Sequence, residues 1–275
     1  MSDFSVLISV YYKEKALFLK EALDSIWSNQ LLKPKQIVLV EDGPLTPDLY
    51  EVIHNFQEQA GDVLTLVRNE TNQGLAKALN RGIKVVTTEL IARMDSDDIS
   101  DEKRFLYEIE YMDKHPDIMI LGGSIQEMDE TGRMLGKRFY PESHEKILQH
   151  IWKGTPLAHP TVIMRKSVFE NIHYNEDVGQ NEDIALWFDA LRNEIKMANL
   201  NTIVYFFRMS PNLYSRRGRR KAWNELKIYS KGLWSLFGFS YKYIYPFLRF
   251  LFRLCSPCIV KYCYNSNIRR KILES

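Results

Sequence analysis

The sequence predicts an α/β fold in which a mostly parallel β-sheet carries helices on both faces, and a basic, amphipathic helical tail follows it. Three observations predict this fold. Short apolar runs typical of strands alternate with stretches of helical periodicity over the first 115 residues, which favours parallel strands joined by crossover helices. Each expected strand ends in polar residues. An excess of Lys and Arg near the C-terminus sets the tail apart.

The first part of the chain supplies four strand-helix units in succession. Residues 4–11 form an almost continuous run of β-branched and aromatic side chains, and apolar residues then recur at helical spacing over 16–27. The alternation continues along the chain. Further strands are expected over 36–41, 63–67 and 90–94, and further helices over 49–56, 75–86 and 102–114.

The strict alternation stops after residue 114. Residues 118–128 and 133–140 are typical of a β-hairpin with a turn at 129–132. A helix over 142–152, a strand over 161–165 and a helix over 182–191 are expected next. We therefore divide the chain into three regions, namely residues 1–115, 116–210 and 211–275.

Charge separates an acidic body from a basic tail. The chain has a net charge of +2, yet residues 208–275 contain fifteen Lys and Arg against two acidic residues, which leaves −11 for the remainder. Aromatic side chains alternate with the basic ones from Trp223 onward, a composition typical of a segment that lies in a membrane interface. Nucleic acid is the competing partner for such a surface. No stretch reaches the ~18 uncharged apolar residues of a membrane span.

All three cysteines, Cys255, Cys258 and Cys263, lie in the tail. An odd, clustered set does not predict a disulfide framework. Cys255 and Cys258 have the spacing of a zinc or redox pair, but no second pair or nearby His completes such a site. Because the N-terminus also shows no signal-peptide pattern, we expect a cytoplasmic protein.

Polar side chains follow all four strands expected in the first region. In parallel sheets, ligands bind at the carboxyl ends of the strands, where loops leave the sheet. The four ends carry Tyr11 to Glu14, then Glu41 to Gly43, then Arg68 and Asn69 with Asn72 to Gly74 beyond, and finally Asp95 to Asp98. Four successive strand ends therefore direct polar groups toward one crevice.

Three carboxylates, Asp95, Asp97 and Asp98, follow the fourth strand directly. Their mutual repulsion is costly unless a cation or solvent screens it. Carboxylate oxygens suit Mg²⁺ or Mn²⁺, which bind through one or two carboxylates together with substrate phosphates. The alternative is a solvated acidic turn that caps the helix beginning near Asp101. The D-x-D spacing alone does not separate these two interpretations.

Five segments, in order, resemble the signatures of family 2 glycosyltransferases with the GT-A (Rossmann-like) fold. They are Ser9 to Glu14, Ile37 to Pro44, Asn72 to Gly74 with Asn80, Arg93 to Asp98, and Asn181 to Trp187. The resemblance covers residues 4–210. The first two segments are similar to the bacterial branch that builds O-antigen and exopolysaccharide repeat units. The tail beyond Arg220 is not covered.

The resemblance implies a nucleotide-sugar site in residues 1–115. It makes Asp42 the acceptor for the N3-H of uracil, Asp95 a neighbour of ribose and metal, and Asp97 the direct ligand of Mn²⁺ or Mg²⁺, with Asp98 in a supporting place. An Asx turn before Gly43 is the alternative for Asp42. The implied nucleotide-sugar residues are Tyr11, Glu14, Asp42, Arg68, Asn72, Gly74, Lys77, Asp95 and Ser96.

One departure concerns the helix after the Asn72 loop. Family members often carry Ala-Arg-Asn there, whereas this chain has Ala78-Leu79-Asn80. The arginine contact to the nucleotide is therefore missing, and Lys77 or Arg68 is our hypothesis for its replacement.

The resemblance also implies that residues 116–210 bind the acceptor and supply the catalytic base. Asp183 matches the usual general base, with Glu182 as the second candidate; the alternative is a pair of first-turn acids that favour the helix dipole. His159 resembles the His-Pro-Thr loop that faces the acceptor, or is structural. Arg216 and Arg217 are expected to close over the diphosphate, or to form a basic surface patch for lipid head groups.

Taken together, the resemblance implies an inverting transferase. It would move a hexose from UDP-galactose or UDP-glucose to a polyprenyl-diphosphate-linked acceptor at the inner face of the bacterial membrane, in O-antigen synthesis, without nucleic acid. A sugar-phosphate nucleotidyltransferase is a second possibility, although residues 11–17 lack the glycines of its phosphate loop. A non-catalytic peripheral membrane adaptor is a third.

Overall fold

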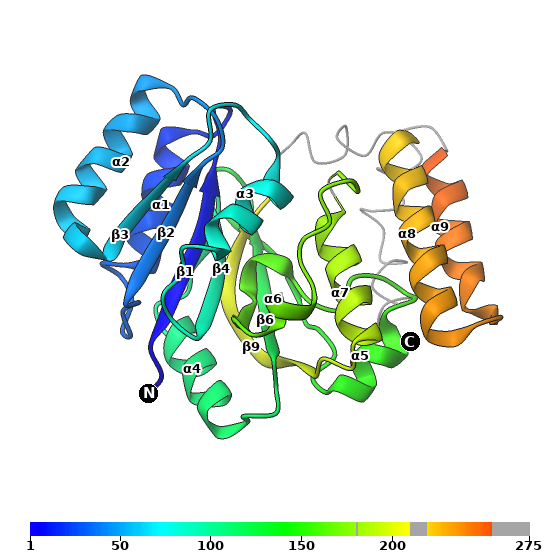
Figure 1. Ribbon diagram of the computed structural model, residues 1–275. Helices are drawn as coiled ribbons and strands as arrows, with labels where there is room; N and C mark the ends of the chain where they lie inside the picture. Colours follow the sequence, from blue (N-terminus) through cyan, green and yellow to red (C-terminus); the bar gives the residue numbers. More distant parts are fainter. Residues whose placement is uncertain (180, 210–218, 255–275) are drawn as a thin grey trace.

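The computed structural model describes residues 1–179, 181–209 and 219–254, and a nine-stranded sheet runs through the middle of the molecule (Figure 1). The strands are β1 (Phe4–Val10), β2 (Gln36–Glu41), β3 (Leu64–Arg68), β4 (Leu90–Asp95), β5 (Ile99–Ser100), β6 (Ile120–Met128), β7 (Met134–Arg138), β8 (Ile163–Arg165) and β9 (Met197–Arg208). The helices are α1 (Ala16–Ile26), α2 (Pro47–Ala60), α3 (Leu75–Ile83), α4 (Arg104–Lys114), α5 (His144–His150), α6 (Val168–Asn171), α7 (Glu182–Arg192), α8 (Arg219–Phe237) and α9 (Ile244–Leu254).

The half of the sheet predicted from the alternation is parallel. Its strands lie in the order β3-β2-β1-β4, and β1 pairs in parallel with both β2 and β4. Beyond β4 the sheet is mixed, because β8 runs antiparallel to β4 and to β6. The predicted α/β class and the hairpin of β6 and β7 are confirmed. The carboxyl ends of β1 to β4 meet at one edge, as expected.

The longest strand, β9, was not predicted from the sequence. It pairs in parallel with β6 and antiparallel with the two-residue strand β5. Polar residues interrupt its apolar pattern at Asn199, Asn201 and Thr202. The strand matters for the site because it carries Tyr205 and Arg208 up to the loop that follows β4.

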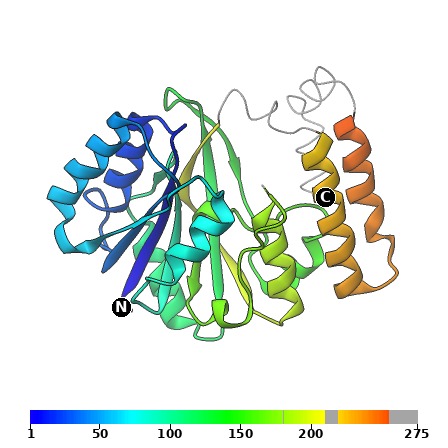
Figure 2. The ribbon, with the colours of Figure 1, turned by 45° about the horizontal axis from the view of Figure 1, so that its top comes forward.

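Helices cover both faces of the sheet (Figure 2). One apolar core contains side chains of α1, α2 and α4 with one face of the strands, and a second contains side chains of α3, α7 and α8 with the other. Successive residues of β4 point to opposite faces, so that Met94 joins the first core and Ile91 the second. Arg93 shares the face of Ile91, and it is fully buried.

The described part of the tail packs against the body. Tyr229 and Leu233 of α8 are buried in the second core. Gly232 lies so close to α7 that a Cβ there would stand 2.3 Å from the ring of Phe188. The Phe188 ring also meets Tyr229 edge-on, with 5.4 Å between centroids. Helix α8 therefore shares a core with residues 116–210.

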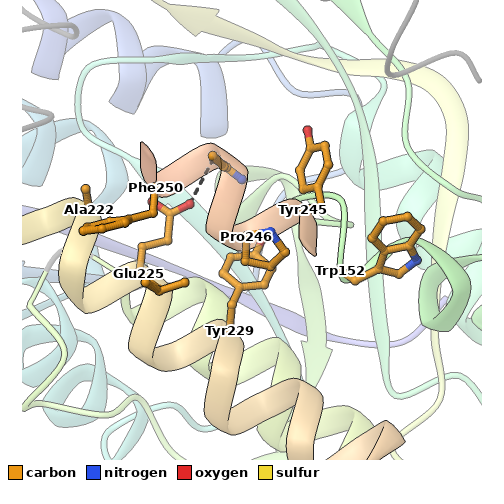
Figure 3. A pocket seen from close by; sticks show the side chains of 9 residues that line it. Trp152, Ala222, Glu225, Tyr229, Tyr245, Pro246 and Phe250 are labelled. Atoms are coloured by element: carbon orange, nitrogen blue, oxygen red, sulfur yellow. Dashed lines mark ion pairs between the residues drawn. The ribbon is translucent and has the colours of Figure 1, made fainter. Parts of the chain in front are cut away.

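Helix α9 is fastened to α8 by an ion pair, marked by the dashed line in Figure 3, and by one aromatic contact. Arg249 lies 3.1 Å from the buried Glu225 carboxylate, and the rings of Trp223 and Phe250 are 5.5 Å apart. Large apolar side chains of this helical pair and of the connection between its helices remain exposed; they include Trp223, Trp234, Phe239, Tyr241, Ile244, Phe247 and Leu248. Over the described parts of the chain, no helix has the length and apolar character needed to cross a membrane.

Candidate active site

The acidic triplet forms a tight cluster at the end of β4. One carboxylate oxygen each of Asp95, Asp97 and Asp98 lies within 4.8 Å of the others. Burial raises the pKa of the Asp97 carboxyl to about 7, and the negative charges of Asp95 and Glu14 add to this effect. Burial, together with the charge of Asp97, also raises the pKa of Asp98. Asp98 is 1% exposed, and α4 begins only at Arg104, without a side-chain cap, so the structure does not support the alternative of a solvated capping turn.

Two buried arginines that the sequence interpretation overlooked hold the cluster in place. Arg93 forms an ion pair with Asp95. From the end of β9, Arg208 donates its backbone N–H to Asp98 Oδ1 at 2.6 Å and its Nε–H to the Asp97 carbonyl at 2.7 Å. Arg208 Nη2 donates to Glu21 at 2.5 Å. A structural role for Arg93 could have been recognised from the sequence, since a charged residue inside an apolar strand requires a partner.

The cluster fits a divalent cation. Asp98 Oδ2 is buried and has no hydrogen-bond partner among the described residues. Such an oxygen, next to two further carboxylates, matches the hard ligands that Mg²⁺ and Mn²⁺ prefer. Asp95, Asp97 and Asp98 are thus the residues that would hold the ion.

The end of β1 lies beside this cluster, as the order of strand ends predicts. Ser96 Oγ donates to Glu14 Oε2 at 3.1 Å. Glu14 follows a turn in which its N–H donates to the Tyr11 carbonyl at 3.0 Å. Three of the predicted nucleotide-sugar residues, Tyr11, Glu14 and Ser96, therefore lie together.

Asp42 fastens the loop between β3 and α3. Its Oδ1 accepts from Asn69 Nδ2 and from the Gln73 N–H, and its Oδ2 accepts from the Gly74 N–H, each at 2.9 Å. Asn72 Nδ2 donates to the Asp42 carbonyl at 3.1 Å. Asp42, Asn72 and Gly74 are thus brought together, and the Asp42 carboxylate holds the loop between β3 and α3 in place.

The two candidates for the missing arginine contact lie at the periphery. Arg68 donates its Nε–H to the buried Glu41 carboxylate at 3.2 Å, and Lys77 is exposed on α3. Asn80, the motif residue of the same helix, binds the backbone of Tyr174 in both directions, at 2.8 and 3.0 Å. Its place in this chain is therefore to hold the segment around Tyr174.

In the region predicted to bind the acceptor, His159 is buried in a small aromatic group. Its Nε2 lies 2.8 Å from the Tyr174 hydroxyl, and its ring meets Trp187 of α7 edge-on with 6.0 Å between centroids. Burial lowers the pKa of His159 well below its usual value, and the positive charge of Arg93 lowers it further. The imidazole is consequently neutral near pH 7.

Glu182 and Asp183 occupy the first turn of α7, with Glu182 buried and Asp183 half-buried. Burial raises the pKa of the Tyr174 phenol, the positive charge of Arg93 opposes this rise, and the negative charges of Glu182, Asp183 and Asp95 add to it. Tyr174 therefore lies within electrostatic reach of both acidic groups. Arg216 and Arg217 fall outside the described residues, as do the three cysteines.

Sequence comparison shows the relatives of the chain. The profile of the family described as Glycosyl transferase family 2 matches residues 5–173. An uncharacterized glycosyltransferase of Haemophilus influenzae is 34% identical over 97% of this chain and 99% of its own. The amylovoran biosynthesis glycosyltransferase AmsE of Erwinia amylovora is 32% identical over 96% and 98%. The Escherichia coli UDP-Gal:alpha-D-GlcNAc-diphosphoundecaprenol beta-1,3-galactosyltransferase is 33% identical over 82% and 83%.

Solved structures share the fold. S. aureus TarS, residues 1–349, superposes with a TM-score of 0.62 at 22% identity, covering 86% of this chain and 72% of that one. The mannosyltransferase PcManGT from Pyrobaculum calidifontis, in complex with GDP-Man and Mn²⁺, gives a TM-score of 0.64 at 17% identity, covering 91% and 69%.

Proposed function

This chain belongs to glycosyltransferase family 2, and from that premise we propose that it is a metal-dependent, inverting hexosyltransferase of surface-polysaccharide synthesis. The proposed donor is UDP-galactose or UDP-glucose, and the proposed acceptor is a sugar carried on a polyprenyl diphosphate. The full-length match to AmsE and the match to the E. coli galactosyltransferase support this class of reaction.

The observation that carries the proposal is the packing that connects two acidic groups. Asp95 belongs to the carboxylate cluster at the end of β4, and Asp183 belongs to the first turn of α7. Arg93, which pairs with Asp95, donates its backbone N–H to the segment that follows His159, and the ring of His159 packs against Trp187 of α7. This packing supports a site in which a candidate cation-binding group and a candidate base belong to neighbouring elements.

In the proposed reaction, Asp183 accepts the proton of the acceptor hydroxyl as that oxygen attacks the anomeric carbon. The new carbon–oxygen bond forms on the face opposite the nucleoside diphosphate, which leaves with the electron pair of the broken bond. The configuration at the anomeric carbon is therefore inverted. When bound, the divalent ion offsets the negative charge of the diphosphate. Arg93 and Arg208 keep the three aspartates in place.

The test is release of nucleotide from a panel of UDP- and GDP-sugars in the presence of Mn²⁺ and a synthetic lipid-linked acceptor. We expect turnover with UDP-galactose or UDP-glucose, and a loss of at least about a hundredfold in Asp183→Asn, the usual scale for a general base. Asp97→Ala is expected to abolish turnover. Asp62→Asn, which alters an exposed carboxylate after α2, is the matched control. Turnover that survives in Asp97→Ala, or no turnover with any donor, contradicts the proposal.

We further propose that the outer face of α8 and α9 lies on the inner surface of the bacterial membrane. Its exposed aromatic side chains accompany the basic residues Lys227, Lys231 and Lys242. Burial of apolar side chains in the interface and attraction to anionic lipids both favour such binding. A lipid-linked acceptor would then be met at the surface where it resides.

The membrane proposal is tested by sedimentation with vesicles that contain phosphatidylglycerol. Trp234→Glu combined with Phe239→Glu should abolish binding, because these side chains are 63% and 99% exposed on the proposed face. Leu17→Glu combined with Leu31→Glu is the matched control, since both leucines are 62% exposed elsewhere on the molecule. Equal loss in the two double variants, or retention in both, contradicts the assignment of this face.

A further inference from the structure

Arg93 is an unusual residue for the centre of a sheet. It lies on β4 between two strands, and its own side chain is 2% exposed. An arginine is almost never buried to this degree without partners. One of its amino groups, Nη2, is paired with Asp95. Its Nε and Nη1 have no hydrogen-bond partner among the described residues. Its position is therefore maintained by the carboxylate cluster rather than by a complete set of hydrogen bonds.

The surroundings of Arg93 connect the two sides of the site. Its backbone N–H donates to the carbonyl of Val162 at 2.8 Å, which places it next to the segment that follows His159. The carbonyl of Arg93 accepts from Nη2 of the fully buried Arg104 at 2.9 Å. The charge of Arg93 acts on His159 and on Asp97. Arg93 thus contacts the carboxylate cluster through its side chain and the segment that follows His159 through its backbone.

The charges around Arg93 indicate how its guanidinium affects the carboxylate cluster. Three carboxylates within 4.8 Å of one another repel strongly. Arg93 neutralises the charge of Asp95 directly, whereas among the residues that the structure describes no ion pair engages Asp97. Arg208 contributes through its backbone N–H and its Nε–H, and its Nη2 is committed to Glu21. The cluster is therefore neutralised unevenly, with Asp95 restrained.

We infer that Arg93 is a positioning residue, which restrains Asp95 and lowers the negative charge of the cluster so that the three aspartates hold the divalent ion with moderate affinity. This inference rests on the proposed metal site. Moderate affinity has a use, because an ion that is held partly by substrate phosphates leaves with the nucleotide product. An ion bound too tightly by three free carboxylates would slow the release of that product.

The inference predicts that loss of Arg93 tightens binding of the ion while it slows turnover. Arg93→Met keeps the bulk of the side chain and removes its charge. We expect Mn²⁺ alone, titrated into the nucleotide-free protein and followed by the electron paramagnetic resonance of free Mn²⁺, to bind at least about fivefold more tightly, because a unit charge a few ångströms away acts on this scale. We expect kcat to fall at least tenfold. Arg93→Lys keeps the charge, and should retain the Mn²⁺ affinity of the natural chain within about twofold.

A double-mutant cycle separates positioning from a general loss of structure. In the background of Asp95→Asn, no carboxylate is released when Arg93 is removed, so the tightening by Arg93→Met should shrink. Weaker or unchanged Mn²⁺ binding in Arg93→Met, or an equal tightening in both backgrounds, overturns the inference and leaves the proposed function standing. Absence of Mn²⁺ binding by the natural protein, both alone and with UDP, overturns the metal site and the inference with it.

Discussion

Neutralising Asp97 should make the metal-free protein more stable while it removes activity. The folded protein raises the pKa of this carboxyl from 3.8 to about 7. A raised pKa means that the folded state binds the proton more tightly than the unfolded state, so the group stabilises the fold below pH 4 and loses that contribution as the pH rises through 7. At pH 8 the ionised carboxylate therefore costs stability, and an amide in its place does not.

The magnitude follows from the shift. About three pKa units correspond to about 4 kcal/mol at pH 8, and relaxation of the half-buried cluster reduces this to about 2 to 4 kcal/mol. For a chain of this length that gain raises Tm by roughly 4 to 16 °C. At pH 4.5 the same calculation leaves a gain of about 1 kcal/mol, because the natural carboxyl is then mostly protonated in the folded protein.

The assay is thermal unfolding of the natural protein and Asp97→Asn in EDTA at pH 8 and pH 4.5. Asp62→Asn controls for the loss of one surface charge. Addition of Mn²⁺ should then raise the Tm of the natural protein and leave Asp97→Asn unchanged, since only a state that binds the ion is stabilised by it. An unchanged or lower Tm for Asp97→Asn at pH 8 in EDTA refutes the reasoning.

Three further substitutions test the framework of the site. Gly43→Ala should destabilise the fold by about 2 kcal/mol or more in urea unfolding and weaken UDP binding, because φ at Gly43 is +89° and the new Cβ would lie 2.6 Å from a backbone nitrogen. Gly61→Ala is the control: φ there is +57° and the new Cβ meets open space, so this variant measures the backbone strain alone. Tyr174→Phe removes the partner of His159 and should cost about 1 to 3 kcal/mol, measured in the same way. Gly232→Ala forces α8 away from α7 and should cost about 1 to 3 kcal/mol, and a cost near zero means that the two helices separate freely.

The predictable part of the fold is the part with a regular pattern. The strands β1 to β4 are short apolar runs with polar ends, so periodicity alone located them and placed their ends at one edge. Strand β9 was not predicted, because Asn199, Asn201 and Thr202 interrupt its apolar pattern and because its pairing with β6 is made by backbone hydrogen bonds. Backbone pairing over such a distance in the sequence leaves no periodic signal.

The candidate site divides in the same way. Asp95, Asp97 and Asp98 were identified because they are adjacent in the sequence and follow a strand. Arg208 and Tyr174 were not, because each reaches the site from an element far away in the chain. The place of Asp42 at a strand end was predicted from the sequence. Its three hydrogen bonds to the loop that follows β3 were not predicted, because they depend on a turn that forms only in the folded chain.

The close approach of α8 to α7 has a geometric consequence for the choice of acceptor. Gly232 lets α8 pack directly against Phe188 of α7, so the helix that carries Asp183 in its first turn and the helix that carries the exposed Trp234 behave as one rigid unit. If the outer face of α8 and α9 rests on a bilayer, as proposed, the contact between α7 and α8 fixes the distance of Asp183 from the lipid surface. The enzyme would then act on an acceptor sugar only when its hydroxyl lies at that distance from the membrane surface.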